Sequence, residues 1–329
     1  MQTALVNNRQ TRRRVHIRPN LAIMKGTIAD LKFVRYGDTV VPIIMGRERK
    51  RIINHILPQG LNQYVSDLIT VNNNIKANNG FINGWGSSPG NAIQLLNNGS
   101  VVQTLNATVI PVLNGSTVIW VFIANDLSSS SYTANQVNLF VSVNYITSGG
   151  GVLYSPGFNL ATATTNIVKQ SGETISFIWE IQLNLGSDAL TDFIFGILYS
   201  IPVVQTSCAG SNTSVGTFGG AHLPTGTGPY YFSSITLQYI GGSSSANISS
   251  ITISYDGTNT YLVITATVLV SSQVTATSIV INVSAVSGAY FCINGQEVSS
   301  GSVIQIPYSA TVPSGNVTVT VTIEFSPAT

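Results

Sequence analysis

The apolar positions in the first quarter of the chain predict short helices. Apolar residues three and four positions apart lie on one helix face. This repeat relates five residues of segment 61–70, namely Leu61, Tyr64, Val65, Leu68 and Ile69. It also relates four residues of segment 47–57, in which the basic residues take the other face: Ile52, Ile53, Ile56 and Leu57. Brief apolar runs within 21–45 predict short strands instead.

From about residue 77 the pattern is typical of β-structure. Segments rich in β-branched and aromatic residues are bounded by Gly, Asn, Ser or Pro, and no helical repeat interrupts them. The clearest of these segments are 100–113, 116–124, 136–146, 173–185 and 191–204. Segment 251–270 predicts a hairpin that turns at Asp256-Gly257.

These patterns predict a mainly β protein with two stacked β-sandwiches after a small basic N-terminal module of mixed α/β structure. An Asn-rich run ends the module, and the Gly/Ser-rich stretch 240–247 divides the β region. The predicted domains are a basic arm and docking module with short helices (1–76), a jelly-roll-like sandwich (77–240) and a smaller immunoglobulin-like sandwich (241–329).

Charge divides the chain more sharply than hydrophobicity does. Charged residues make up 8% of the 329 residues, and the net charge is +2. Thirteen basic and four acidic residues give the first 76 residues a net charge of +9. The remaining 253 residues hold one basic and eight acidic residues, for a net charge of −7. The two ends of the chain are therefore expected to meet different surroundings.

The basic residues predict a docking surface, because arginines bind phosphates and carboxylates through charge and a planar donor fork. The predicted docking residues are Arg9, Arg12, Arg13, Arg14, Arg18, Arg47, Arg49, Lys50 and Arg51. Val15 and Ile17 alternate with His16 and Arg18, which favours strand addition to a protein partner. Nucleic acid is the second candidate partner, and a membrane surface is the third. Deleting residues 1–20 is expected to prevent docking and to leave the β region (77–329), which we call the β body, folded.

The residues beyond 76 are poorly suited to catalysis, so the sequence predicts no enzyme, no cofactor and no metal site. General acid–base chemistry needs a titratable pair in a pocket. The four candidate carboxylates are interpreted as solvated loop and strand-end groups: Glu173, Glu180, Asp188 and Asp192. His222 is the one histidine of this region, and His16 and His55 are interpreted as partner-contacting or surface residues. No phosphate-binding, nucleophile-elbow or zinc-protease motif is present in the sequence.

Several features predict that the β region faces the outside of a cell or particle. Seven Asn residues in N-x-[S/T] sequences are candidate glycosylation sites: Asn98, Asn106, Asn114, Asn212, Asn247, Asn282 and Asn316. Cys208 and Cys292 are either two buried thiols or a disulfide between two β segments. A surface of Ser, Thr and Asn does not titrate, which suits an acidic medium. The sequence predicts neither a transmembrane helix nor a secretion signal, so export inside a particle is expected.

The Arg-rich stretch RQTRRRVHIRPN (9–20) followed by the strand-rich region 77–329 resembles structural proteins of virions. The Asn-, Ser-, Thr- and Val-rich, lysine-poor body is similar to those of archaeal viruses from hot acidic springs, in which jelly-roll proteins build shells, pentons and turrets. The resemblance implies a penton, turret or spike component. Such a component would self-associate into a symmetric oligomer, dock on other capsid proteins and expose its β body outside the virion.

Three alternatives remain open at this point. The first is a major capsid protein of the double jelly-roll type, although its two barrels would be closer in size than the two predicted segments. The second is a secreted surface adhesin or filament subunit that assembles by strand exchange. The third is an acid-active glycosidase or protease with an accessory β domain, and the scarcity of catalytic groups argues against it.

Overall fold

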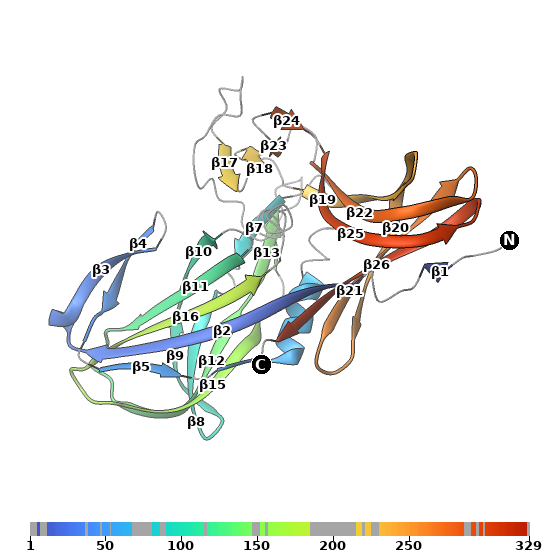
Figure 1. The fold of residues 1–329 in the computed structure, drawn as a ribbon. Helices are drawn as coiled ribbons and strands as arrows, with labels where there is room; N and C mark the ends of the chain where they lie inside the picture. The colour runs from blue at the N-terminus through green and yellow to red at the C-terminus, as the bar shows by residue number, and fades with distance from the viewer. Residues whose placement is uncertain are drawn as a thin grey trace.

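The computed structural model describes residues 5–6, 12–36, 39–46, 48–52, 54–67, 81–85, 90–114, 117–146, 152–154, 157–184, 215–218, 221–224, 230–285, 291–293, 296–298 and 300–327. Strands dominate these residues, which confirms the prediction of a mainly β fold (Figure 1). A 3-10 turn, η2 (Ile28–Asp30), and an α-helix over residues 58–67 accompany the strands. The jelly-roll-like and immunoglobulin-like topologies remain predictions.

Twelve strands join in the largest sheet. They are β1 (Leu5–Val6), β2 (Arg12–Gly26), β5 (Glu48–Ile52), β10 (Thr108–Asn114), β11 (Thr117–Asp126), β16 (Thr174–Asn184), β19 (Tyr230–Tyr239), β20 (Gly242–Tyr255), β21 (Thr260–Val270), β22 (Val274–Ala285), β25 (Ser300–Val312) and β26 (Gly315–Pro327). Their order is β10-β11-β16-β2-β26-β21-β20-β19-β22-β25, with β5 on β2 and β1 on β26.

The other strands form smaller sheets. A five-stranded sheet has the order β6 (His55–Ile56), β15 (Phe158–Lys169), β12 (Tyr132–Val141), β8 (Ala92–Asn97), β9 (Ser100–Asn106). A three-stranded sheet joins β14 (Val152–Tyr154), β13 (Val143–Ile146) and β7 (Phe81–Trp85). Three hairpins pair β3 (Leu31–Tyr36) with β4 (Thr39–Ile44), β17 (Val215–Phe218) with β18 (Ala221–Pro224), and β23 (Phe291–Ile293) with β24 (Gln296–Val298).

Strand β16 shows how residue alternation builds the core. Successive side chains of a strand point to opposite faces of the sheet. Phe177, Trp179 and Ile181 join the main hydrophobic cluster, which also contains most of the buried apolar residues of the five-stranded sheet. Ile178 points the other way into a smaller cluster beneath the β3–β4 hairpin. We call this second side of the β10-β11-β16-β2-β5 region the outer face.

Strand β2 joins two halves of the molecule: an N-terminal half that contains β2 to β16 and a C-terminal half that contains β19 to β26. Its residues 16–26 pair antiparallel with β16, and residues 12–17 pair in parallel with β26. Figure 1 shows β2 starting beside β26 and then crossing the N-terminal half. The main hydrophobic cluster runs through this junction, from Ile17 and Trp179 to Ile323 and Phe325. The predicted boundary at residue 77 therefore does not correspond to a break in this sheet, because β2 lies inside it.

Strand β20 also changes partners along its length. Residues 242–247 pair with β19, and residues 248–255 pair with β21. The Gly/Ser-rich stretch 240–247, predicted to divide two domains, is thus the turn and first part of a hairpin. Gly241 has a positive φ of 89°, which allows this tight turn. The hairpin predicted at Asp256-Gly257 is confirmed, since Asp256 Oδ1 accepts hydrogen bonds from the backbone N–H groups of Thr258 and Asn259.

The β3–β4 hairpin is inserted where β2 would otherwise turn directly into β5. Residues 21–25 of β2 pair with residues 52–48 of β5, and the hairpin occupies the chain between them. Two glycines form its neck. A Cβ on Gly46 would lie 1.9 Å from the carbonyl oxygen of Lys25 and 2.8 Å from the Cα of Gly26. Only glycine fits this approach, so the neck fixes where the hairpin leaves the sheet.

One predicted helix is wrong and the other is confirmed in its described part. Segment 47–57 forms strands β5 and β6 rather than a helix. Ile52 and Ile56 are buried as predicted, but pairing with β2 and β15 overrides the helical repeat. Residues 58–67 are helical, with Leu61, Tyr64 and Val65 in the main cluster. Leu68 and Ile69 lie outside the described residues.

Candidate functional site

Three of the predicted docking arginines lie on the outer face. In the β2–β5 ladder Arg49 is opposite Met24 and Arg51 is opposite Ala22. Met24 and Ala22 belong to the cluster beneath the β3–β4 hairpin, so both arginines project on that side. Arg18 precedes Ala22 by four residues and shares its side of β2. All three arginines are exposed.

Lys50 is separated from these arginines by the sheet. It pairs with Ile23, whose side chain lies in the main cluster. The Lys50 ammonium donates a hydrogen bond to Thr165 Oγ1 of β15 at 3.3 Å. The predicted set therefore divides between two faces, which a helix over 47–57 would not have produced.

The other predicted docking residues are placed only in part. Arg12, Arg13 and Arg14 belong to β2, where their backbones pair with Thr322, Ile323 and Glu324 of β26. Strand addition is thus observed, but the partner is the same chain rather than another protein. The side chains of these three arginines lie outside the described residues, as do Arg9 and Arg47.

The β3–β4 hairpin stands beside the outer-face arginines. Burial raises the pKa of Tyr36, the negative charge of Glu180 raises it further, and the positive charge of Arg49 opposes this rise. Tyr36 of β3 therefore lies within electrostatic reach of both groups. Glu180 accepts a hydrogen bond from Asn20 Nδ2 at 3.0 Å.

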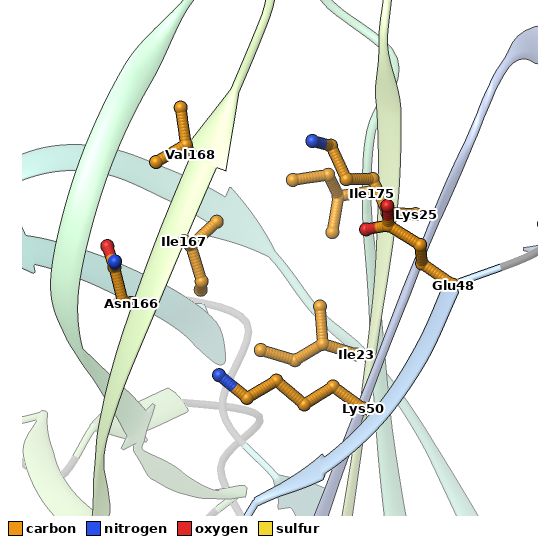
Figure 2. Close-up of a pocket in the computed structure, with 8 residues that line it drawn as sticks. All are labelled: Ile23, Lys25, Glu48, Lys50, Asn166, Ile167, Val168 and Ile175. Atoms are coloured by element: carbon orange, nitrogen blue, oxygen red, sulfur yellow. The ribbon is translucent and has the colours of Figure 1, made fainter.

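A cavity of about 250 Å³ opens on the other side of β2, between β2 and β15 (Figure 2). It is lined by Ile23, Lys25, Glu48, Lys50, Asn166, Ile167, Val168 and Ile175. Lys25 forms an ion pair with Glu173 at 2.8 Å. The cavity thus combines an apolar wall with lysines whose charges are offset by nearby carboxylates, and its charge does not select an anion.

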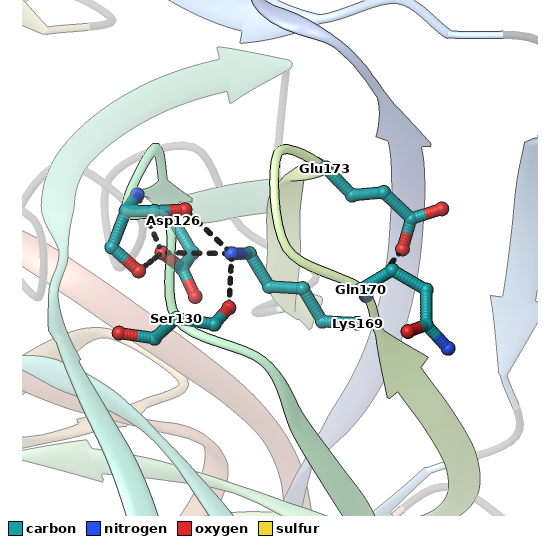
Figure 3. Close-up of polar contacts among 6 residues, drawn as sticks. Asp126, Ser130, Lys169, Gln170 and Glu173 are labelled. Carbon is teal, nitrogen blue, oxygen red and sulfur yellow. Dashed lines mark hydrogen bonds and ion pairs between the residues drawn. The ribbon is translucent and has the colours of Figure 1, made fainter.

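Lys169, the single basic residue beyond position 76, is buried (Figure 3). Its ammonium donates hydrogen bonds to the carbonyl oxygens of Ser128 and Ser130, at 2.6 and 2.7 Å. Asp126 Oδ1 lies 3.9 Å away, and the two side chains are 0% and 1% exposed. Burial raises the pKa of Tyr132, and the nearby negative charge of Asp126 raises it further. Lys169 therefore ties the loop between β11 and β12 to β15.

The candidate catalytic carboxylates do not form a pair among the described residues. Glu173, in the turn before β16, accepts a hydrogen bond from the backbone N–H of Gln170 at 2.6 Å. Its ion pair with Lys25 and that hydrogen bond lower the pKa of Glu173. Glu180 instead projects from the opposite side of β16 toward Asn20. Asp188 and Asp192 lie outside the described residues.

The histidines and cysteines are placed only in part. His55 is exposed on β6. His16 belongs to β2 and His222 to β18, but their side chains lie outside the described residues. Cys208 and the side chain of Cys292 also lie outside them, so the structure does not test the disulfide.

The candidate glycosylation sites differ in accessibility. Asn98 sits in an exposed turn with a positive φ of 51°. Asn106, Asn247 and Asn316 are exposed on strands. The Asn282 amide is occupied instead, because it donates hydrogen bonds to Ser234 and Thr236 and accepts one from Ser302. Asn212 and the side chain of Asn114 lie outside the described residues.

Sequence patterns did not reveal the Lys169–Asp126 cluster or the hairpin beside the arginines. One signal for the Lys169–Asp126 cluster is that the 253 residues beyond position 76 contain a single basic residue, which points to a specific partner for it. For the second, Phe33 stands between Lys32 and Arg35 in β3, so one short strand carries both apolar and basic side chains.

Within the described part of the chain, no helix has the length and apolar character needed to cross a membrane. In that same part, no three His, Cys, Asp or Glu side chains gather where they could hold a metal ion. The sequence matches no protein-family model, and no curated protein is significantly similar to it.

Proposed function

We propose that this chain is a structural component of a virus particle. The basic residues that β2 and β5 place on the outer face dock in the shell, and the strands that do not contribute to this face project outward as part of a penton, turret or spike. The observation that carries the proposal is the separation of charge. Thirteen of the 14 basic residues lie in the first 76 positions, and Arg18, Arg49 and Arg51 share one exposed face.

The position of β2 supports a mechanical role for this face. Because β2 pairs with β16 over its whole C-terminal part and with β26 over its N-terminal part, it belongs to both halves. A partner that holds the outer face of β2 and β5 would therefore hold both halves in a fixed orientation. A projecting shell component needs this rigidity.

The decisive test is isolation of particles that contain the chain. Particles would be purified by density and checked for this chain, for nucleic acid and for other shell proteins. Incorporation of the triple variant Arg18→Glu, Arg49→Glu, Arg51→Glu should fall at least about tenfold, since each reversed charge repels what the arginine attracts. Thr252→Glu, Ser254→Glu and Thr258→Glu, at exposed positions around the β20–β21 turn, form the matched control. Absence of the chain from every nucleic-acid-containing particle would reject the proposal.

A further inference from the structure

We propose that the β3–β4 hairpin binds the surface of an anionic lipid layer. This inference goes beyond the assembly role, because that role does not require a lipid partner. It rests on three observations: apolar side chains exposed on the hairpin, basic side chains around it, and the height of the hairpin above the arginines.

Exposed large apolar side chains are concentrated on the hairpin and its two ends, compared with the rest of the described chain. Four of the 11 large apolar side chains that are exposed fall within residues 28–45. They are Ile28, Phe33, Val40 and Met45, with exposed fractions of 61%, 73%, 51% and 49%. Exposed apolar groups that gather on one element mark an interaction site.

The two faces of the hairpin are separated by strand alternation. Val41 and Ile43 of β4 are buried against the outer-face cluster, and this packing anchors the hairpin. On the opposite face Phe33 lies across from Pro42, and Arg35 lies across from Val40. The free face therefore presents Phe33 and Val40 together with a guanidinium group.

Positive charge surrounds these apolar side chains. Lys32 and Arg35 are exposed on β3, and Arg49 of β5 lies within electrostatic reach of Tyr36. Arg18 and Arg51 are exposed on the same face of the sheet as Arg49. Two carboxylates of this region are engaged locally: Asp30 accepts hydrogen bonds from the backbone and hydroxyl of Thr27, and Glu180 accepts one from Asn20. Asp38 lies outside the described residues. Five exposed basic residues outnumber these acids around the hairpin. Arg35 shares the free face with Phe33, Lys32 extends from the anchored side of β3, and the other three lie on the sheet. The net positive charge matches an anionic surface.

The apolar and basic side chains stand at different heights above the sheet, and this fits a lipid interface better than a flat protein surface. The hairpin packs as a second layer on the sheet, and such layers lie about 10 Å apart. Its free face thus stands about one layer above the arginines of β2 and β5. Interfacial apolar groups insert about 5–10 Å to the acyl boundary. At that depth the arginines would lie near the phosphates of the headgroups.

The chemistry of the exposed side chains disfavours nucleic acid as the occupant. Single-stranded nucleic acids are held by aromatic side chains on which bases stack. Phe33 is the only aromatic residue among the four exposed apolar side chains, and the other three are aliphatic. Aliphatic side chains beside lysine and arginine instead combine the two contributions that drive peripheral lipid binding.

The test measures co-sedimentation of the full-length chain with vesicles. One set contains equal parts of phosphatidylcholine and phosphatidylglycerol, and the other contains phosphatidylcholine alone. The chain is expected to bind the first set, and added salt should weaken this binding. Its binding to the second set should be at least tenfold weaker. In a Phe33→Trp variant the new indole should shift its fluorescence to shorter wavelength on the anionic vesicles, because it enters the acyl boundary.

Paired variants separate the two contributions. Phe33→Ser with Val40→Ser should weaken vesicle binding at least about tenfold. Val101→Ser with Leu269→Ser, at exposed apolar positions on β9 and β21, should leave it unchanged. Lys32→Gln with Arg35→Gln should weaken binding about 25-fold, since each basic residue near an anionic surface contributes about fivefold. All four positions of the test variants are exposed, and thermal unfolding checks that each variant remains folded.

Three results would overturn the inference: no binding to the anionic vesicles, equal binding to both vesicle sets, or equal loss in the hairpin and control variants. Binding of a single-stranded oligonucleotide without vesicle binding would assign the face to nucleic acid. Dimerisation that Phe33→Ser abolishes, again without vesicle binding, would assign it to a second copy. If the chain is found in particles but fails to bind vesicles, only the lipid inference is refuted. If it binds vesicles but is absent from particles, only the assembly role is refuted.

Discussion

The N-terminal and C-terminal halves satisfy their buried polar groups in different ways. In the N-terminal half, Lys169 and Asp126 form a buried ion pair, and Lys25 and Glu173 form a more exposed one. The C-terminal half has no lysine or arginine at all from residue 170 onward. Its polar network is built instead from amides and hydroxyls, as in the hydrogen bonds of Asn282 with Ser234, Thr236 and Ser302.

A second uncharged network crosses the same C-terminal sheet. The Gln238 side-chain oxygen accepts hydrogen bonds from the hydroxyl of Ser278 and the amide of Gln305. Neither amides nor hydroxyls change charge at ordinary pH, so such a network is insensitive to acid. The comparison teaches that the C-terminal half relies mainly on uncharged hydrogen bonds, whereas the N-terminal half also relies on ion pairs.

The largest effect is expected from cutting the strand that the two halves share. Deleting residues 1–20 removes the pairing of β2 with β26, and it removes Ile17 from the core. Removal of one buried Ile side chain costs about 2–5 kcal/mol, and each lost ladder bond adds about 1 kcal/mol. Together these losses approach the whole stability of a typical domain. We expect no cooperative unfolding transition by calorimetry.

This expectation replaces the one drawn from the sequence, in which the β body stays folded without residues 1–20. Deletion of residues 1–4, which precede β1, is the control and should leave the melting temperature within a few degrees. A truncated chain that unfolds cooperatively near the temperature of the full chain would show that the halves do not depend on β2.

The next effect compares the two ion pairs. Lys169→Met should destabilise the fold by about 3–5 kcal/mol, because it leaves Asp126 buried without its cation. Lys25→Met removes the pair with Glu173, whose side chains are 23% and 30% exposed, and should cost at most about 1 kcal/mol. Denaturant unfolding of both variants measures the difference, and similar costs would contradict the role given to burial.

A smaller effect is expected from the uncharged network. Asn282→Ala should cost about 1–3 kcal/mol, since it removes the partner of three hydroxyl groups at once. Asn247→Ala, at an exposed position on β20, should change the free energy of unfolding by less than about 0.5 kcal/mol. If the two substitutions cost the same, the C-terminal half would not rely on this network.

The smallest effect concerns pH. Hydrogen bonds from the Tyr261 hydroxyl and from the backbone N–H groups of Asn259 and Thr258 lower the pKa of Asp256 from 3.8 to about 2. A carboxyl whose pKa is lower in the folded than in the unfolded chain adds stability above about pH 4. That stability is lost as the pH falls toward 2.

Asp256→Asn should therefore lower the melting temperature by no more than a few degrees at about pH 5, and the gap should close near pH 2. Thermal scans of both proteins across this range test the point. A gap that is constant with pH would mean that the Asp256 charge contributes nothing to folding. A large cooperative loss near pH 4 would contradict the acid-tolerant body predicted from composition.

The sequence alone determined the mainly β class, the helical character of residues 61–67 and the hairpin turn at Asp256-Gly257. These features depend on local causes: alternation of apolar residues, a helical repeat, and a residue pair suited to a tight turn. The sequence also determined that positive charge belongs to one end of the chain, since that is a property of composition.

The tertiary structure decided the features that depend on pairing between strands distant in the sequence. Segment 47–57 carries a helical repeat, yet pairing with β2 makes part of it a strand and sends Lys50 and Arg49 to opposite faces. The N-terminal arm is predicted to add a strand to a partner protein, yet it completes a sheet with β16 and β26 of its own chain. Lys169 meets Asp126 across 43 positions because β15 folds back beside the β11–β12 loop. Strand partners distant in sequence are selected by the packing of the whole core, and no local pattern encodes that choice.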